Sequence, residues 1–249
     1  MPAKIMDFEA PILDIKDYFD EGKLAVRVVK LGTAAAQGFE FKPGQFVMIS
    51  VDAVKSINDP AKPKMSSMSI CSAPHEKNFF ELCMRIHEKP GPSVSRYIGE
   101  KAKKGDKVRV KGPFGVFSMV EGHETAILVS TGTGIAPMMS MLRHLLATGF
   151  KGKIVFFYGC RNKNDFLYGK ELQESAAKSK NLDLQVIFSR EPYNGRQGYV
   201  QSLLESYAFP SDLSKVHVYL CGNPVAVSEE KKALVGRGFA DANLHEEKW

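Results

Sequence analysis

The sequence has few cysteines, and they lie far apart. Its 249 residues include four of them, and no two form a CxxC pair. Iron–sulfur clusters and structural zinc sites need closely spaced cysteine or histidine ligands. The spacing therefore argues against both kinds of site, and we expect any redox cofactor to be organic.

Long hydrophobic runs are also missing. No run approaches the roughly 18 consecutive apolar residues of a membrane-spanning helix. The first residues, MPAKIMDFEAPILDI, carry acids where a signal peptide would have its apolar stretch. The hydrophobic fraction of 44% and the charged fraction of 25% are ordinary for soluble globular proteins. We therefore expect a cytoplasmic protein without membrane insertion.

Positive charge is concentrated in the first half of the chain. Residues 1–118 contain 19 Lys and Arg against 14 Asp and Glu, and much of the excess lies within residues 84–111. A lysine-rich solvated surface explains such a segment, and so does electrostatic steering of an acidic partner such as a ferredoxin or flavodoxin. Nucleic acid is a poorer match, because aromatic residues for base stacking are not interleaved with the charges.

Two sequence textures predict two domains. In residues 1–118, short β-branched or alternating runs are separated by Gly, Pro and Asp, which is typical of a small antiparallel barrel; these runs cover residues 24–31, 45–51, 67–72, 79–86 and 107–110. In residues 119–249, apolar runs alternate with helical stretches, which predicts an α/β domain with a parallel sheet. We place the boundary between Phe117 and Glu121.

A glycine-rich turn opens the second domain. The sequence AILVSTGTGIAPMMSMLRHLL places Thr131, Gly132, Thr133 and Gly134 between a strand and a helix. Glycines there let a pyrophosphate approach the backbone at the helix N-terminus. Many tight turns contain glycine for conformational reasons alone, so this motif by itself does not distinguish a nucleotide site from an ordinary turn.

Three further segments follow predicted strands, where open α/β sheets bind ligands. They read YGCR (158–161), SRE followed by GRQGYVQ (189–201), and CGNP (221–224). The whole set resembles the ferredoxin–NADP reductase family, and the resemblance covers nearly the full chain. It implies a flavin-binding barrel followed by an NAD(P)-binding domain, with NADP favoured over NAD.

The resemblance implies the residues that hold the nucleotide. Arg190 and Arg196 would contact the 2′-phosphate and Tyr199 would stack on the adenine, although Arg190 could instead pair with Glu191. The other implied NADP-binding residues are Thr131, Gly132, Thr133, Gly134, Arg161, Ser189, Gln201, Cys221, Gly222 and Asn223.

The flavin site implied by the resemblance departs from the family in its first motif. Ser66 stands where the family has an arginine for the pyrophosphate, and Met68 where it has a tyrosine against the flavin ring. Lys64 or Arg96 could supply the missing charge. FAD is expected and FMN is an alternative, as is a barrel that has lost its flavin. The implied flavin-binding residues are Ser66, Ser67, Met68, Ser69, Cys83, Met84, Arg85, Ser93, Val94 and Ser95.

The resemblance also implies a reacting centre. Ser69 would lie near flavin N5 and Cys221 beside the nicotinamide, while Glu247 and Trp249 belong to a tail that covers the flavin. Cys221 could equally be a buried small hydrophobe and the tail could be frayed. We expect a reductase that exchanges electrons between NAD(P)H and a ferredoxin or flavodoxin. The alternatives are an NADH-dependent oxygenase reductase or flavin reductase, and an electron-transfer subunit of a larger complex.

Overall fold

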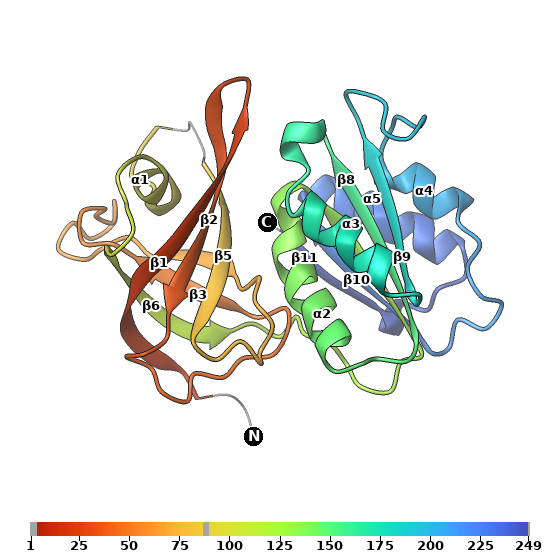
Figure 1. Ribbon diagram of the computed structural model, residues 1–249, viewed down its shortest axis with the longest axis horizontal. Helices are drawn as coiled ribbons and strands as arrows, with labels where there is room; N and C mark the ends of the chain where they lie inside the picture. The colour runs from red at the N-terminus through yellow and green to blue at the C-terminus, as the bar shows by residue number, and fades with distance from the viewer. Residues whose placement is uncertain (1–3, 87–89, 249) are drawn as a thin grey trace. The chain divides into compact units, whose positions relative to one another are not determined.

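The computed structural model describes residues 4–86 and 90–248, and the chain divides into two compact units (Figure 1). The first unit is Met1–Met119 together with Met139–His144, and the second is Val120–Met138 together with Leu145–Trp249. In the described part of the chain, every helix is too short or too polar to cross a membrane.

The first unit is an antiparallel barrel, as the sequence predicts. Its strands are β1 (Met6–Asp20), β2 (Lys23–Gly32), β3 (Phe46–Ser50), β4 (Ser66–Ser69), β5 (Phe79–Arg85) and β6 (Lys107–Phe114), and its helix is α1 (Val94–Glu100). They form one sheet in the order β4-β3-β6-β1-β2-β5. An antiparallel bridge between Ile70 and Leu82 joins its two ends and nearly closes the barrel. Closure covers strand edges that would otherwise expose unpaired backbone groups.

The longest strand, β1, is not anticipated by the sequence analysis. Aspartates interrupt its apolar residues, and aspartate is depleted in strands. Packing and pairing overcome this preference. Asp17 accepts two hydrogen bonds of 2.7 Å from the Arg27 guanidinium on β2, which also donates to the carbonyl oxygens of Ile98 and Ala102 at the end of α1. One arginine thus joins β1, β2 and α1.

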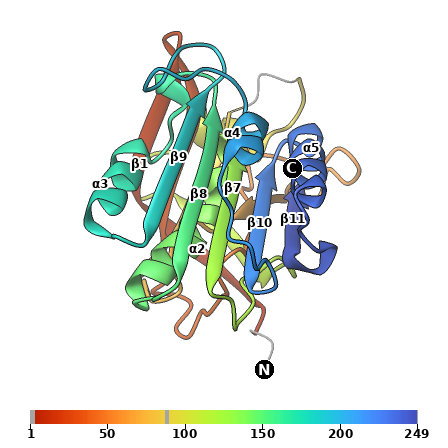
Figure 2. The ribbon, with the colours of Figure 1, turned by 90° about the vertical axis from the view of Figure 1, so that its right-hand side faces the viewer.

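The second unit is a parallel sheet with helices, which confirms the expected α/β fold. Its strands are β7 (Thr125–Thr131), β8 (Lys153–Cys160), β9 (Leu182–Phe188), β10 (Val216–Gly222) and β11 (Leu244–Lys248). Its helices are α3 (Gly169–Lys178), α4 (Val200–Ser206) and α5 (Pro224–Gly236), together with the two ends of α2 (Ile135–Ala147), whose residues 139–144 belong to the first unit. The short 3-10 turns are η1 (Gly132–Gly134), η2 (Lys163–Asp165) and η3 (Asp241–Asn243). The strand order is β11-β10-β7-β8-β9 (Figure 2).

The strand order reverses between β7 and β10, and this reversal positions the ligand site. Chain order runs from β7 toward β9 on one side and from β10 to β11 on the other. Open α/β sheets bind ligands at the carboxyl ends of the strands beside such a switch point. Alternate residues of β7, such as Ile127 and Val129, form one hydrophobic core with α4 and α5 residues, so those helices cover one face of the sheet.

One side chain in this core is an acid. Glu230 on α5 is fully buried, and neither of its carboxylate oxygens has a hydrogen-bond partner among the described residues. Burial, with a smaller contribution from the neighbouring charge of Glu229, raises the pKa of Glu230 to about 7. A buried carboxyl group without partners is stable only when neutral.

Glu230 should therefore make stability fall as pH rises. Its folded pKa lies above the unfolded value, so protonation favours the folded state, and this advantage is lost between about pH 4.5 and 7. We predict that Glu230→Gln raises the free energy of unfolding by about 1–3 kcal/mol near pH 8, with little effect near pH 5.

Thermal unfolding at both pH values measures this difference. The matched control is Glu205→Gln on the surface of α4, which should leave stability within about 0.5 kcal/mol at either pH. Equal pH dependence in the parent protein and in Glu230→Gln would show that Glu230 does not ionise in this range.

Candidate cofactor-binding sites

The register of β4 against β3 determines where the first predicted flavin motif points. Met68 pairs with the buried Val47 and packs in part against the barrel core. Paired residues of antiparallel strands share a face, and successive residues alternate. Ser66 therefore lies on the same face as Met68, whereas Ser67 and Ser69 lie on the other, and Ser69 is buried. Part of the Met68 side chain is thus engaged in packing.

The second predicted segment is largely inside the barrel. Met84 belongs to the hydrophobic core, so its side chain is not offered to a ligand. Cys83 is also buried, and the burial raises the pKa of its thiol well above the usual value. Only Arg85, at the end of β5, is half-exposed. Of these three residues, Arg85 alone presents a charged side chain.

The third predicted segment begins helix α1. Ser93 caps the helix, because its hydroxyl oxygen accepts a hydrogen bond of 3.2 Å from the backbone N–H of Arg96. The hydroxyl oxygens of Ser93 and Ser95 are 3.1 Å apart, whereas Val94 packs into the barrel core. The start of α1 thus holds two adjacent hydroxyl groups.

The polar groups near this turn suit a phosphate. The Lys64 ammonium donates a 2.8 Å hydrogen bond to the carbonyl oxygen of Pro92, and the Arg96 guanidinium donates to that of Gly91. Both cations therefore lie beside the turn that leads to Ser93. Cations and hydroxyl donors bind phosphate oxygens strongly. The donor set fits the phosphate end of a flavin nucleotide.

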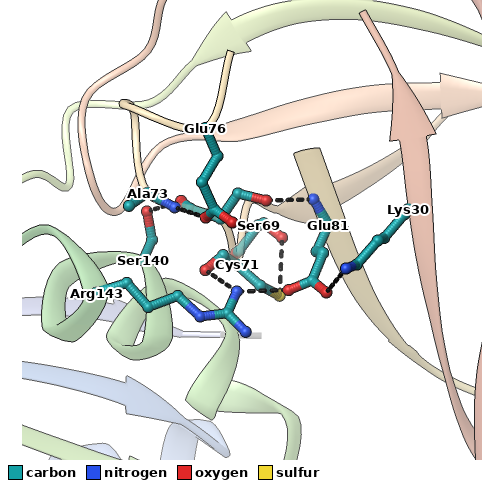
Figure 3. A network of polar contacts seen from close by, with 9 residues as sticks. Lys30, Ser69, Cys71, Ala73, Glu76, Glu81, Ser140 and Arg143 are labelled. Atoms are coloured by element: carbon teal, nitrogen blue, oxygen red, sulfur yellow. Dashed lines mark hydrogen bonds and ion pairs between the residues drawn. The ribbon is translucent and has the colours of Figure 1, made fainter. Parts of the chain in front are cut away.

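A polar network that sequence reasoning missed holds the segment after β4 (Figure 3). The Arg143 guanidinium donates to the carboxylate of Glu81 and, at 3.0 Å, to the carbonyl oxygen of Cys71. The Ser140 hydroxyl donates to the carbonyl oxygen of Ser72 at 2.6 Å. Residues 139–144 belong to the first unit, although they are distant in sequence. No local motif marks these contacts, because they join segments about 60–70 residues apart.

In the second unit, the glycine-rich turn lies where β7 and β10 come closest. A Cβ atom on Gly134 would overlap the carbonyl oxygen of Cys221, and one on Gly222 would overlap the hydroxyl of Thr131. Only glycine fits at both positions. The Thr131 hydroxyl oxygen is buried and has no hydrogen-bond partner among the described residues. A cradle of glycines with an unsatisfied hydroxyl fits a nucleotide at the N-terminus of α2.

Arg161, predicted to bind the nucleotide, is held by an acid of the same unit. Its guanidinium forms an ion pair with the carboxylate of Asp165, which is only 3% exposed. Asn162 supports this turn, because its side-chain oxygen accepts from the backbone N–H groups of Asn164 and Asp165. The charge of Arg161 is therefore largely compensated within the protein.

Arg190 and Arg196 are in a different situation. Both are exposed, and no acid lies within ion-pair distance of either guanidinium in the described part of the chain. Arg196 ends a two-residue turn in which Asn194 and Gly195 have φ values of 50° and 78°, as a type I′ turn requires. Glu191, the alternative partner of Arg190, accepts a 2.6 Å hydrogen bond from the backbone of Lys163 instead.

The residues close in sequence to Arg190 and Arg196 differ in exposure and packing. Tyr199 is 71% exposed, so its ring is open to a ligand. Tyr193, by contrast, packs against Phe188 with ring centroids 4.5 Å apart. Ser189 is half-buried, and its carbonyl oxygen accepts from Gln197. The structure therefore distinguishes one structural tyrosine from one that is available to a ligand.

Cys221 and Glu247, both predicted near the reacting centre, are neighbours on adjacent strands. They are paired in the parallel register of β10 and β11. Cys221 is fully buried and Glu247 is half-exposed.

Asn223, predicted to bind the nucleotide, caps α5 by accepting a 2.9 Å hydrogen bond from the N–H of Val225. Trp249 lies outside the described residues, so its predicted role remains a prediction.

Gln201, also predicted to bind the nucleotide, is hydrogen-bonded to a side chain of α5. Its amide donates a 3.0 Å hydrogen bond to the carboxylate of Glu229.

Two open hollows of about 460 and 670 Å³ flank the edge strand β9. Arg196 lines both, whereas Ser189 and Tyr199 line neither. The segment predicted to hold the adenosine end is therefore an exposed loop beside the hollows.

Two family models match the chain in the order of its domains. The oxidoreductase FAD-binding domain matches residues 23–119, and the oxidoreductase NAD-binding domain matches residues 128–230. A solved structure, the flavohem-like FAD/NAD-binding domain of nitric oxide dioxygenase from Vibrio cholerae, is similar with a TM-score of 0.82. It is 22% identical and covers 97% of this chain and 98% of its own, which shows a shared fold.

Three curated relatives are similar over most of the chain. The glycine betaine monooxygenase reductase subunit of Pseudomonas aeruginosa is 31% identical over 84% of this chain, which spans 56% of that protein. Sulfhydrogenase 1 subunit gamma of Pyrococcus furiosus is 31% identical over 84% of this chain and 68% of its own length. Ferredoxin–NADP reductase B of Sorangium cellulosum is 29% identical over 90% and 91%.

The close approach of β7 and β10 yields a prediction. Gly134→Ala should destabilise the protein by about 1–3 kcal/mol and weaken nucleotide binding, because the added methyl group must displace the backbone at Cys221. Thermal unfolding and titration with NADPH measure the two effects. The control is Gly236→Ala, where nothing lies within 4 Å of the added atom. Equal behaviour of the two variants would contradict the proposed constraint.

Proposed function

The chain belongs to the ferredoxin–NADP reductase family of flavin-dependent oxidoreductases, and from this premise we propose that it transfers electrons between NADPH and a separate small redox protein through bound FAD. The observation that carries the proposal is the presence of both halves in one chain. The barrel offers hydroxyls and cations for a flavin phosphate, and the α/β unit offers a glycine cradle followed by two exposed arginines.

NADPH is proposed over NADH because of the segment after β9. Within residues 4–86 and 90–248, no acid lies within ion-pair distance of Arg190 or Arg196, and a phosphate monoester dianion is a good ligand for guanidinium groups. Tyr199 is exposed enough to stack on the adenine. Ser189 would add a hydroxyl donor. Arg161 has a supporting role, because Asp165 already neutralises its charge.

The protein's part in catalysis is to orient the two cofactors. Bound FAD would supply the capacity to take two electrons from a nicotinamide and to release them singly. We assign the buried Ser69 to the reacting edge of the flavin and Cys221 to the nicotinamide end, with Glu247 paired to Cys221 across β10 and β11. The buried Cys221 would limit the position of the nicotinamide by packing.

The proposed acceptor is an acidic protein such as a ferredoxin or flavodoxin. Part of the basic segment is already neutralised: Lys107 pairs with Glu9 at 3.1 Å and Arg109 with Asp7 at 2.9 Å. The exposed lysines just after α1 have no acid within ion-pair distance in the described ranges; they are Lys101, Lys103 and Lys104. Lys89 lies outside those ranges. We therefore place the steering charge after α1 rather than on β6.

Two alternatives are favoured by specific relatives. The similarity to a monooxygenase reductase subunit favours an oxygenase reductase component, which would use NADH. The similarity to a sulfhydrogenase subunit favours an electron-transfer subunit of a larger complex. The purified chain tests these possibilities. A yellow protein that oxidises NADPH with an artificial acceptor is expected; a colourless protein that acquires flavin only with a partner would overturn the proposal.

Nucleotide selectivity should depend on the two arginines. We predict that Arg190→Ala and Arg196→Ala each lower kcat/KM for NADPH about ten- to hundredfold, because each loses a charge-assisted contact of about 1.5–3 kcal/mol. The value for NADH should change little. Lys178→Ala, an exposed residue at the end of α3, is the control. An equal loss with NADH would show that these arginines do not read the 2′-phosphate.

Reduction of an acidic carrier should depend on salt. We predict that its rate falls as ionic strength rises, whereas reduction of a small neutral acceptor does not, because charges are screened over about 8–10 Å. Reversing the charges of Lys101, Lys103 and Lys104 to Glu should abolish the salt effect. The control reverses the exposed residues Lys151, Lys178 and Lys180 of the second unit. If both triple variants respond alike, only net charge matters.

A further inference from the structure

Several cations on the barrel strands pair with carboxylates. The pairs are Arg27–Asp17, Lys30–Glu81, Lys107–Glu9 and Arg109–Asp7. Lys64, just before β4, is bonded differently. Its side chain is half-buried, its ammonium group binds the Pro92 carbonyl oxygen at 2.8 Å, and no carboxylate in the described part of the chain lies within ion-pair distance. A cation in such a place is unfavourable unless an anion compensates it.

Anion-binding groups lie in and beside the turn that the Lys64 ammonium contacts. Pro92 directly precedes Ser93, whose hydroxyl oxygen lies 3.1 Å from that of Ser95. The Arg96 guanidinium donates to the carbonyl oxygen of Gly91 in the same turn. Two cations and two hydroxyls from segments about 30 residues apart therefore converge on one turn. Phosphate oxygens are the natural acceptors for such a set.

The backbone fixes Lys64 in this position. Its N–H donates a 2.7 Å hydrogen bond to the carbonyl oxygen of Val54, just before the chain enters β4. Lys64 is two residues before Ser66, where β4 begins. The Ser66 side chain is short and carries no charge. The Lys64 side chain is long enough to carry a charge from the start of β4 to the Pro92 carbonyl oxygen.

We propose that Lys64 supplies the positive charge that binds the phosphate of the flavin nucleotide in this protein, next to the hydroxyls of Ser66 and Ser93; this inference rests on the proposed function as a flavoenzyme. The charge therefore comes from the segment before β4 rather than from β4 itself. Arg96 assists from the other side of the turn, where its backbone N–H also bonds to the Ser93 hydroxyl.

Flavin affinity tests the inference without reference to turnover. The full-length protein is stripped of flavin and titrated with FAD, FMN and riboflavin, which lacks phosphate. Lys64→Met keeps the aliphatic stem and removes the charge. We expect it to weaken FAD and FMN binding at least about tenfold, the loss of one charge-assisted hydrogen bond, and to leave riboflavin binding unchanged. Lys62→Met is the control, because Lys62 is exposed and pairs with Asp59 at 2.9 Å.

Two further variants separate charge from folding. Lys64→Arg should retain FAD affinity within about threefold, because it keeps the charge. Adding Ser66→Arg to Lys64→Met should restore FAD binding, because it moves the cation onto β4. Unchanged FAD affinity in Lys64→Met, or an equal loss for riboflavin, would overturn the role of Lys64. Failure of the parent protein to bind any flavin would overturn the proposed function itself.

Discussion

The close approach of the backbone at the carboxyl ends of β7 and β10 is the constraint on which the second unit depends. A side chain on Gly134 would overlap the Cys221 carbonyl oxygen, and one on Gly222 would overlap the Thr131 hydroxyl. Only glycine therefore fits at these two positions. At this switch point between β7 and β10, we propose that the turn before α2 offers backbone N–H groups to a nucleotide. The glycines that permit the close packing of the sheet would then also border the nucleotide.

Charge pairing imposes a comparable constraint on the barrel. Cross-strand ion pairs such as Arg109–Asp7 compensate part of the charge of β1 and β6, and Arg27 holds α1 against β2. Cations without a carboxylate therefore become informative about ligands. Lys64 lies half-buried beside hydroxyl groups, which suits a small anion, whereas Lys103 and its neighbours are exposed, which suits a protein surface.

The sequence predicts what depends on periodicity and local motifs, and misses what depends on distant partners. Barrel, parallel sheet and glycine turn all follow from strand spacing and turn residues. β1 was missed because its aspartates lower strand propensity, and Asp17 needs Arg27 to compensate. Arg143 was missed because its partner Glu81 is 62 residues away. The resemblance implies Met84 as a flavin-binding residue, and the strand's alternation places its side chain in the core, which a motif match alone does not specify.

The three arginines of the predicted nucleotide site show why residue type alone cannot assign a role. Arg161 faces an almost fully buried carboxylate, so moving its charge toward a phosphate would leave Asp165 uncompensated at a considerable cost. No acid of the described residues lies within ion-pair distance of Arg190 or Arg196, so their charge is available without breaking an existing pair. On binding a ligand, such an arginine loses only hydration and side-chain freedom. We therefore propose that discrimination between NADPH and NADH depends on the residues after β9, although Arg161 belongs to an equally recognisable motif.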